Sequence, residues 1–304
     1  MAATMTRRAF SALGAGFATA SMIGSFPSPA RATPNRTVRL PDGTQVSALG
    51  QGSWHLGQGR HSQTVEEDAM VTGIGLGLTL IDTAELYGGG KAEEMISHVI
   101  AGRRDQVFVT SKVLPYHATP AGIRKACAGS LARLKTDHLD LYLLHWRGGI
   151  SDLRPVVETF EELRGQNKIR RWGVSNFGVA DMEDLMKVPR GDQCAANQVE
   201  YNLQSRDIER GVLPWCIAHK IPIMAYSPLG GSGADLLRDA AVRRVASGHN
   251  VKPSAVVLAW TMRSGHSISI PESGSADHVR ENAAALSLAL TEADLQQLDR
   301  AFPA

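Results

Sequence analysis

The chain lacks the residues that mark a disulfide-stapled or metal-binding protein. Only three of its 304 residues are cysteines, and an odd number cannot pair completely. Cys127, Cys194 and Cys216 have neither the spacing of a CxxC redox pair nor that of a metal knuckle, and the histidines show no ligand spacing. We therefore predict three buried free thiols and no metal site.

Most of the chain also has no clear excess of positive or negative charge. The formal net charge is +2, and three of the 32 lysines and arginines lie in residues 1–32, which contain no acidic residue. The remainder has 29 basic and 30 acidic residues, so we expect no nucleic-acid partner. Hydrophobic residues make up 43% of the chain, which is typical of a globular protein and excludes a disordered one.

Residues 1–32 have the pattern of a signal peptide. Arg7 and Arg8 precede 22 uncharged residues rich in Ala, Gly and Ser, and an A-x-A cleavage site ends at Ala32. The paired arginines resemble the twin-arginine type of bacterial signal, which implies the twin-arginine export machinery as a partner. We therefore expect a periplasmic protein cleaved after Ala32, or a cytoplasmic one if the signal is inefficient. A membrane anchor and a flexible basic tail are alternatives, but Gly, Ser and Pro disfavour a spanning helix, and we expect no stable membrane insertion after cleavage.

Residues 33–304 are predicted to form one domain of alternating strands and helices. The segment from Thr37 to Gly50 has the pattern of a β-hairpin, with Pro-Asp-Gly as its turn. The continuous apolar runs that follow suit parallel strands covered on both faces. Eight such strands are expected, at 48–54, 79–84, 107–113, 139–146, 171–177, 195–201, 223–228 and 267–271.

Helical patterns separate these strands. Thr64, Thr119 and Thr291 are predicted N-caps, and Pro120 follows one of them at the first helical position. The expected helices are 65–76, 120–134, 155–165, 208–220, 253–263, 276–286 and 291–302. Eight alternations without a break in composition predict an α/β fold, a (β/α)8 TIM barrel with an N-terminal β-hairpin. A doubly wound sheet is the alternative, but no G-x-G-x-x-G follows the first strand.

Four polar residues lie at or just after the ends of predicted strands, namely Asp82, Tyr87, Lys112 and His145. In a (β/α)8 barrel the carboxyl ends of the strands meet at one mouth, where active sites lie. Each residue alone has an ordinary explanation, such as a cap, a turn or core packing, but lysine is rarely buried without a partner. The four together favour an active site.

Seven segments resemble the aldo/keto reductases in order and spacing. They are IDTAELYG (81–88), TSKV (110–113), LLHW (143–146), GVSNF (173–177), NQVEYN (197–202), AYSPL (225–229) and IPES (270–273). The short C-terminal tail is similar to that of the compact bacterial methylglyoxal and diketogluconate reductases. The resemblance implies a (β/α)8 barrel that reduces aldehyde and ketone carbonyls of small substrates by hydride transfer from NADPH or NADH.

The resemblance also implies a role for each polar residue. Tyr87 is the general acid that protonates the carbonyl oxygen, and Lys112 lowers the pKa of the phenol toward neutrality. Asp82 keeps Lys112 charged and oriented, and His145 holds the substrate carbonyl. Trp54, Tyr116 and Trp146 are the expected substrate-pocket residues. The expected cofactor-binding residues are Gly52, Ser175, Asn176, Gln198, Tyr226, Ser227, Leu229, Gly230, Pro271, Ser273, Glu281 and Asn282.

One departure from the family pattern concerns the choice of cofactor. The IPxS segment of the family commonly has Lys as its third residue and Arg six positions later, and both hold the extra phosphate of NADP. Glu272 and His278 occupy these positions here, with Arg280 close by. A carboxylate repels a phosphate and can accept hydrogen bonds from a ribose diol, so NADH stays open beside NADPH.

Two other functions remain open from the sequence. A barrel of this type can bind NAD(P) without turnover, as a redox sensor or partner-binding subunit, although an intact set of four polar residues favours an enzyme. An unrelated barrel isomerase or hydrolase would need a phosphate loop or paired carboxylates at the strand ends, and the sequence has neither. The chain is expected to be a monomer.

Overall fold

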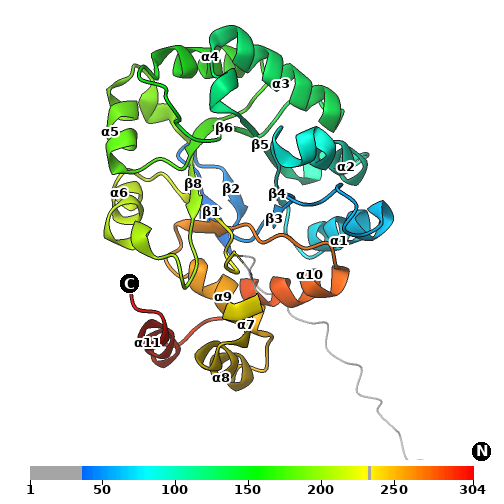
Figure 1. The fold of residues 1–304 in the computed structure, drawn as a ribbon, viewed down its shortest axis with the longest axis vertical. Helices are drawn as coiled ribbons and strands as arrows, with labels where there is room; N and C mark the ends of the chain where they lie inside the picture. Colours follow the sequence, from blue (N-terminus) through cyan, green and yellow to red (C-terminus); the bar gives the residue numbers. More distant parts are fainter. Residues whose placement is uncertain (1–35, 232–233) are drawn as a thin grey trace, which may run out of the picture. The chain divides into compact units, whose positions relative to one another are not determined.

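The computed structural model describes residues 36–231 and 234–304. The predicted signal peptide, residues 1–32, lies outside the described residues. Within them, a ring of helices surrounds a sheet of parallel strands (Figure 1).

The described part of the chain contains an eight-stranded parallel sheet in which each strand pairs with the next. Its strands are β3 (Gln51–Gly52), β4 (Leu80–Asp82), β5 (Phe108–Val113), β6 (Leu141–Leu144), β7 (Trp172–Ser175), β8 (Asn197–Glu200), β9 (Ile223–Tyr226) and β10 (Ser267–Ser269). The first and last strands also meet, because Gly50 N donates to Ser269 O and Gly52 N donates to Pro271 O, both at 2.8 Å. The predicted (β/α)8 barrel is confirmed.

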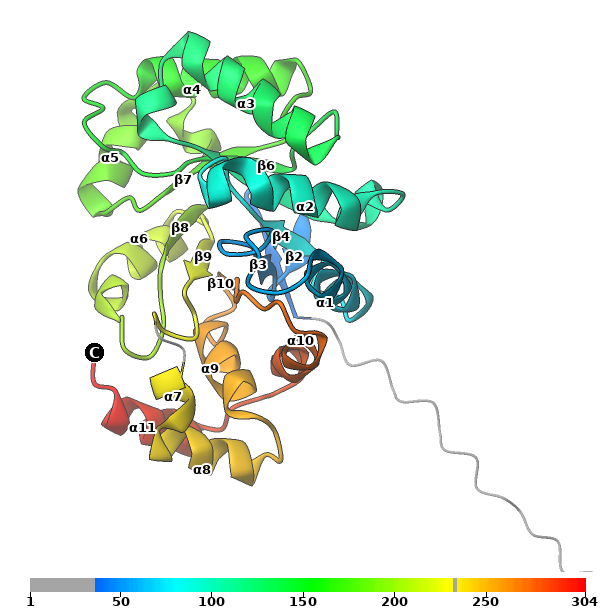
Figure 2. The ribbon, with the colours of Figure 1, turned by 45° about the vertical axis from the view of Figure 1, so that its right-hand side comes forward.

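Each strand of the barrel is followed by a helix that covers its outer face. These helices are α1 (Gln63–Gly75), α2 (Lys91–Ile100), α3 (Pro120–Leu134), α4 (Arg154–Gly165), α5 (Val179–Lys187), α6 (Val212–Ala218), α9 (Pro253–Thr261) and α10 (Ala276–Ala283). Three more lie outside this alternation, α7 (Ala234–Arg238), α8 (Ala240–Gly248) and α11 (Glu292–Ala301). Both ribbon views place α11 beside α8, at the edge of the ring (Figures 1 and 2).

The predicted N-terminal hairpin is present as β1 (Thr37–Arg39) and β2 (Gln45–Ser47), paired antiparallel. Its turn residue Gly43 has φ +89°, a left-handed conformation that glycine adopts without strain. Val38, Leu40 and Val46 are buried, and Figure 1 shows the hairpin through the ring, behind the strands. The hairpin therefore closes the end of the barrel away from the viewer.

The structure corrects several helix predictions. The single helix expected over 208–220 is wrong, because Gly211 leaves helical geometry (φ −151°, ψ −75°) and separates a 3-10 turn from α6. Thr64 is not the N-cap of α1: the helix begins at Gln63, and Ser62 occupies the N-cap position without a side-chain capping hydrogen bond. Thr119 and Thr291 are confirmed as caps, since their side chains accept hydrogen bonds from Gly122 N and Asp294 N.

Among the described residues, the sequence analysis missed four helices, α2, α5, α7 and α8. α2 and α5 begin after Gly90 and Gly178, so the Ser, Thr, Asp or Asn that usually announces a helix start is missing there. α8 did carry that signal, because the Asp239 carboxylate accepts hydrogen bonds from Ala241 N and Val242 N. The alternative explanation of Ser175 and Asn176 as a helix cap is wrong, since Gly178 occupies the cap of α5.

The predicted free thiols are confirmed. Cys127, Cys194 and Cys216 are buried and unpaired, and burial raises the pKa of each thiol to about 12. Across residues 36–231 and 234–304, no cluster of three or more His, Cys, Asp or Glu side chains could hold a metal ion. Over the same residues no helix combines the length and apolarity that a bilayer span requires.

Candidate active site

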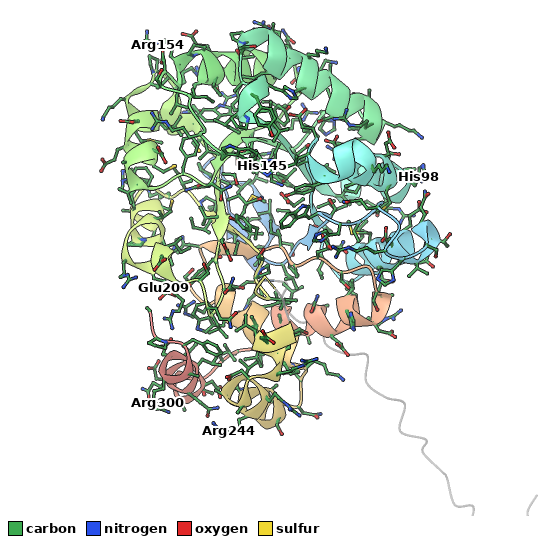
Figure 3. The ribbon with its side chains drawn as sticks, in the orientation of Figure 1. His98, His145, Arg154, Glu209, Arg244 and Arg300 are labelled. Atoms are coloured by element: carbon green, nitrogen blue, oxygen red, sulfur yellow. The ribbon has the colours of Figure 1, made fainter. Side chains whose placement is uncertain are left out.

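Three neighbouring strands bring the four predicted catalytic residues together. Asp82 ends β4, Lys112 lies in β5 and His145 directly follows β6, and these strands pair in parallel. Tyr87 begins the 3-10 turn Tyr87–Gly90 that follows β4. Figure 3 shows His145 near the centre of the ring, whereas Arg154, Arg244 and Arg300 lie at its periphery. The site therefore lies at the barrel mouth, as the sequence predicted.

Lys112 is fully buried and forms three hydrogen bonds. Its Nζ lies 2.7 Å from Asp82 Oδ2, 2.9 Å from Tyr87 Oη and 3.0 Å from Thr83 O. An ammonium has three hydrogens, so every donor is used. Burial works against the charge, but Asp82 and Tyr87 outweigh it, and the pKa of Lys112 is raised. Lys112 is therefore a cation at neutral pH.

The phenol of Tyr87 behaves differently from the sequence prediction. Burial raises its pKa above the ordinary value, and the opposing effect of Lys112 does not overcome it. Part of the reason is that Asp82 also acts on the phenol and raises its pKa. The predicted shift of this pKa toward neutrality is therefore wrong. Tyr87 is a neutral proton donor, which is the form that carbonyl reduction needs.

His145 is a neutral imidazole. Burial, together with the charge of Lys112, lowers its pKa to about 3. Its ring lies edge-on to the Tyr87 ring, with 5.9 Å between the centroids. The buried Nδ1 has no hydrogen-bond partner among the described residues, while Asn176 Nδ2 donates to the backbone O of His145 at 3.0 Å. A neutral histidine held in this way can donate a hydrogen bond to a carbonyl oxygen without supplying a charge.

These residues open into a pocket of about 480 Å³ at the barrel mouth, within the usual range for small-molecule sites. Lys112 lies beneath its floor and does not line it. The predicted residues that do line it are Gly52, Trp54, Asp82, Tyr87, His145, Trp146, Ser175, Asn176, Gln198, Tyr226, Ser227, Leu229, Gly230 and Pro271. The structure thus brings together most of the predicted catalytic, cofactor and substrate residues.

Four of the predicted cofactor-binding residues, Ser175, Asn176, Gln198 and Tyr226, are joined to one another or to the catalytic residues by hydrogen bonds. Tyr226 Oη donates to Asn176 Oδ1 at 3.0 Å, and Ser175 Oγ donates to Gln198 O at 2.9 Å. Gln198 Nε2 also donates to Asp82 Oδ1 at 2.7 Å, which ties this group to the catalytic residues. Neutral amides and hydroxyls suit an uncharged carboxamide better than a phosphate.

The loop after β9 lines the pocket with Ser227, Leu229 and Gly230. Ser227 has φ +46° and Gly230 has φ +82°, and Asn202 Nδ2 donates to Ser227 O at 3.0 Å. Gly230 N donates to Ser227 O at 2.9 Å, so this N–H is used within the loop. The neutral polar groups of the pocket fit a nicotinamide, and the loop after β9 would lie beside the pyrophosphate of a bound dinucleotide.

Besides Lys112, four predicted site residues do not line this pocket. Tyr116 is 68% exposed and contacts Trp146 edge-on at the outer rim. Ser273 binds Ser275 O through its hydroxyl, Glu281 pairs with Lys252 at 3.5 Å, and Asn282 is buried at the end of α10. The pocket does not extend to the predicted cofactor-binding residues Ser273, Glu281 and Asn282.

Glu272 lies in the pocket and is held by a partner that the sequence did not reveal. Its carboxylate accepts hydrogen bonds from His55 N at 2.7 Å and from His55 Nδ1 at 3.0 Å. Trp54 stacks on the His55 ring with 4.9 Å between the centroids. Arg280, considered a substitute phosphate ligand, is instead paired with Asp277 at 2.7 Å. His55, Arg60 and Leu86 are pocket residues that the sequence analysis missed.

A buried ammonium, a neutral phenol and a neutral imidazole at the mouth of a (β/α)8 barrel define a carbonyl reductase that uses a nicotinamide cofactor. The chain belongs to the Aldo/keto reductase family, whose sequence profile matches residues 48–302.

Individual relatives cover nearly the whole domain. Over 272 residues, 88% of this chain, it is 44% identical to methylglyoxal reductase YeaE of Escherichia coli and covers 95% of that protein. It is 30% identical over 256 residues to methylglyoxal reductase DkgB of Salmonella typhimurium, covering 82% of this chain and 90% of that one. The crystal structure of an aldo/keto reductase from Klebsiella pneumoniae in complex with NADP and acetate is 44% identical, with a TM-score of 0.85 over 88% of this chain and 96% of that one.

The protein is therefore an enzyme that reduces carbonyl groups, and the interpretation as a barrel without turnover is set aside. When bound, the nicotinamide supplies the hydride. The geometry suits the roles that the sequence predicts. The Tyr87 phenol would give its proton to the carbonyl oxygen, and the Lys112 ammonium, 2.9 Å away, would stabilise the phenolate that remains. Asp82 Oδ2 lies 2.7 Å from Lys112 Nζ and would keep it in place, and His145 would orient the carbonyl beside the phenol.

Proposed function

We propose that this enzyme reduces small α-oxoaldehydes of the methylglyoxal type with NADPH. The observation that carries the proposal is the pairing of two neutral donors, Tyr87 and His145, on the floor of one pocket. An α-oxoaldehyde has two adjacent carbonyl oxygens. One of the two donors can therefore protonate the reacting oxygen while the other donor orients the substrate. The relatives YeaE and DkgB, named as methylglyoxal reductases, support this substrate class.

The pocket dimensions support a small substrate. The volume of about 480 Å³ must hold the nicotinamide end of the cofactor as well as the carbonyl compound. Trp54, Leu86 and Trp146 form apolar walls around the remaining space. Such walls favour a short carbon chain over a sugar with many hydroxyl groups, whose polar groups would lose hydrogen bonds to water.

Support for NADPH comes from the surroundings of Glu272. Two hydrogen bonds from His55 hold its carboxylate toward the pocket, so the charge is partly satisfied within the protein. Arg60, an exposed cation, lines the same pocket. The Klebsiella pneumoniae relatives of known structure are complexes with NADP and NADPH, and each is 44% identical to this chain.

Steady-state kinetics of the purified chain with both cofactors tests the proposal. We expect a higher kcat/KM for methylglyoxal than for an aldehyde that carries a branched or polyhydroxylated chain, and a lower KM for NADPH than for NADH. Cofactor oxidation without added aldehyde is the blank. A preference for aldoses, or turnover with NADH alone, would overturn the substrate or the cofactor part of the proposal respectively.

We further propose that residues 1–32 export the folded enzyme to the periplasm through the twin-arginine pathway. The paired Arg7 and Arg8 and the A-x-A site ending at Ala32 support this, and the family profile begins only at residue 48. A twin-arginine receptor reads guanidinium geometry, so replacing both arginines with lysine should block export at unchanged charge. Cell fractionation and mass spectrometry of the mature N-terminus measure this. Normal export of the double variant would contradict the twin-arginine assignment.

A further inference from the structure

The catalytic Tyr87 lies on a segment that has little rigidity of its own. Gly88, Gly89 and Gly90 follow it, with φ values of 59°, 66° and 98°. Glycine loses more conformational freedom on folding than any other residue, so three in succession leave the turn easily deformed. Tyr87 nevertheless lies 2.9 Å from Lys112 Nζ, a distance on which proton donation depends. Contacts outside the turn must therefore hold it in position.

A buried carboxylate ties the helix that follows this turn to the strand that carries Lys112. Glu93, on α2, has no exposed surface, and its Oε1 accepts a hydrogen bond from Ser111 Oγ at 2.6 Å. Successive side chains of a strand point to opposite faces. Lys112 points into the barrel and the neighbouring Ser111 points out to α2, so Glu93 binds β5 one residue from the catalytic lysine.

The same carboxylate is paired with a cation from the next helix. Glu93 Oε2 lies 2.6 Å from Arg133 Nε of α3. The Arg133 side chain fills the space beside Gly90, where an added Cβ would lie 2.6 Å from Arg133 Cδ. Arg133 thus contacts the end of the glycine segment and the carboxylate at once. The turn, α2, α3 and β5 meet at one ion pair.

A second tether lies on the other side of Tyr87. Glu85 Oε1 accepts a hydrogen bond from Leu114 N at 2.8 Å, and His117 Nδ1 lies 2.9 Å from the same oxygen. Glu85 precedes Tyr87 by two residues, and Leu114 follows Lys112 by two. The segment that carries the phenol is therefore fastened to the lysine strand both before and after Tyr87.

We propose that Glu93, with its partners Ser111 and Arg133, is the positioning residue that keeps the Tyr87 phenol within hydrogen-bond distance of Lys112. It touches neither substrate nor cofactor, and it acts by fixing α2 and the glycine turn against β5. A buried ion pair is weak evidence for stability, since apolar side chains of similar volume can replace one without loss. Because this ion pair lies beside the turn that carries Tyr87, we assign it a role in positioning the phenol and not in stabilising the fold.

The test compares Glu93→Gln and Ser111→Ala with the wild-type enzyme. Loosening the turn displaces the phenol, and a displacement of about 1 Å at a reacting group can lower the rate about 100-fold. We expect kcat to fall roughly 10- to 100-fold in Glu93→Gln and by less in Ser111→Ala. The KM for aldehyde and the dissociation constant for NADPH should stay within about twofold, because the cofactor residues are on other strands.

The pH profile distinguishes positioning from general destabilisation. Lys112 opposes the rise in the pKa of Tyr87, so a weaker contact lets that pKa rise further, and the alkaline limb of kcat moves to higher pH. Loss of folded protein alone would lower kcat without moving the limb. Active-site titration with NADPH corrects for the folded fraction.

Glu209→Gln is the matched control. Glu209 pairs with Arg263 at 2.7 Å and with Arg206 at 2.8 Å, and Figure 3 places it at the edge of the ring, away from His145. It should lower thermal stability while leaving kcat and the pH profile unchanged. If Glu93→Gln retains wild-type kcat and profile, or changes no more than Glu209→Gln, the proposal is overturned. If Glu93→Gln does not fold, Ser111→Ala decides: a reduced kcat with a shifted limb supports the proposal, and wild-type behaviour overturns it.

Discussion

The floor and the rim of the barrel mouth are held by different interactions. Beneath the floor, Lys112 has no exposed surface and its three donors are satisfied at distances of 2.7–3.0 Å. At the rim, Trp54 is 55% exposed and Tyr116 is 68% exposed, and their contacts are aromatic. Removing one partner from a buried charge pair is strongly destabilising, whereas exposed ring contacts contribute little. Changes in specificity are therefore easier at the rim than changes in chemistry on the floor.

The largest expected effect comes from breaking the floor at its proton donor. Tyr87→Phe removes the phenol oxygen and leaves the ring, so carbonyl reduction should fall roughly 10²- to 10⁴-fold. Cofactor binding should be unchanged, because the hydroxyl faces Lys112 rather than the loop after β9. Turnover assays and fluorescence titration with NADPH measure the two. A variant that kept most of its turnover would remove Tyr87 from the mechanism.

The next-largest effect is the dependence of folding stability on pH that His145 causes. Burial, with Lys112, lowers the pKa of His145 to about 3, whereas an unfolded chain has the ordinary value near 6.5. Between these values the unfolded state binds a proton that the folded state does not, so stability is lost as pH falls. The loss from this group is about 2 kcal/mol at pH 5. Urea unfolding measures the free energy of unfolding between pH 7 and pH 4, and it should depend less on pH in His145→Gln than in the wild type. Identical pH dependence in the two proteins would contradict the prediction.

At the rim, a smaller change in cofactor preference is expected for Glu272→Lys. Like charges at about 4 Å repel by roughly 4 kcal/mol at an effective dielectric of 20, and if solvent screening leaves about a quarter of this, the effect is about fivefold in relative affinity. Because His55 holds the carboxylate, the gain for NADPH over NADH should be below tenfold and largest at low salt. Dissociation constants for both cofactors measure it. Glu272→Gln, which removes the charge alone, is the control.

The smallest effect is expected for Tyr116, and it tests where the pocket ends. Tyr116→Ala should change the KM for methylglyoxal by less than about twofold, because the side chain is mostly exposed and lies outside the pocket. Trp146→Ala, which removes a pocket wall, should raise it more. Equal effects of the two variants would mean that the functional pocket extends to the outer rim.

Much of the barrel and of its floor was predictable because the signals are local. Apolar runs mark the strands, and Thr119 and Thr291 mark two helix starts through their own side chains. Asp82, Lys112 and His145 follow from the same logic, since a polar residue at the end of a buried strand has few structural uses. Helices that begin after glycine, such as α2 and α5, gave no such signal.

The amino-acid sequence by itself determined the order of the eight barrel strands, the family and which four polar residues meet at the barrel mouth. Only the tertiary structure decided that Glu272 binds His55, 217 positions away in the chain, and that Tyr116 lies outside the pocket. It also decided the direction in which the pKa of Tyr87 moves, because that depends on how deeply the phenol is buried and on how Asp82 offsets Lys112. Periodicity and capping act between neighbours in sequence, whereas burial and charge pairing depend on which distant segments pack together.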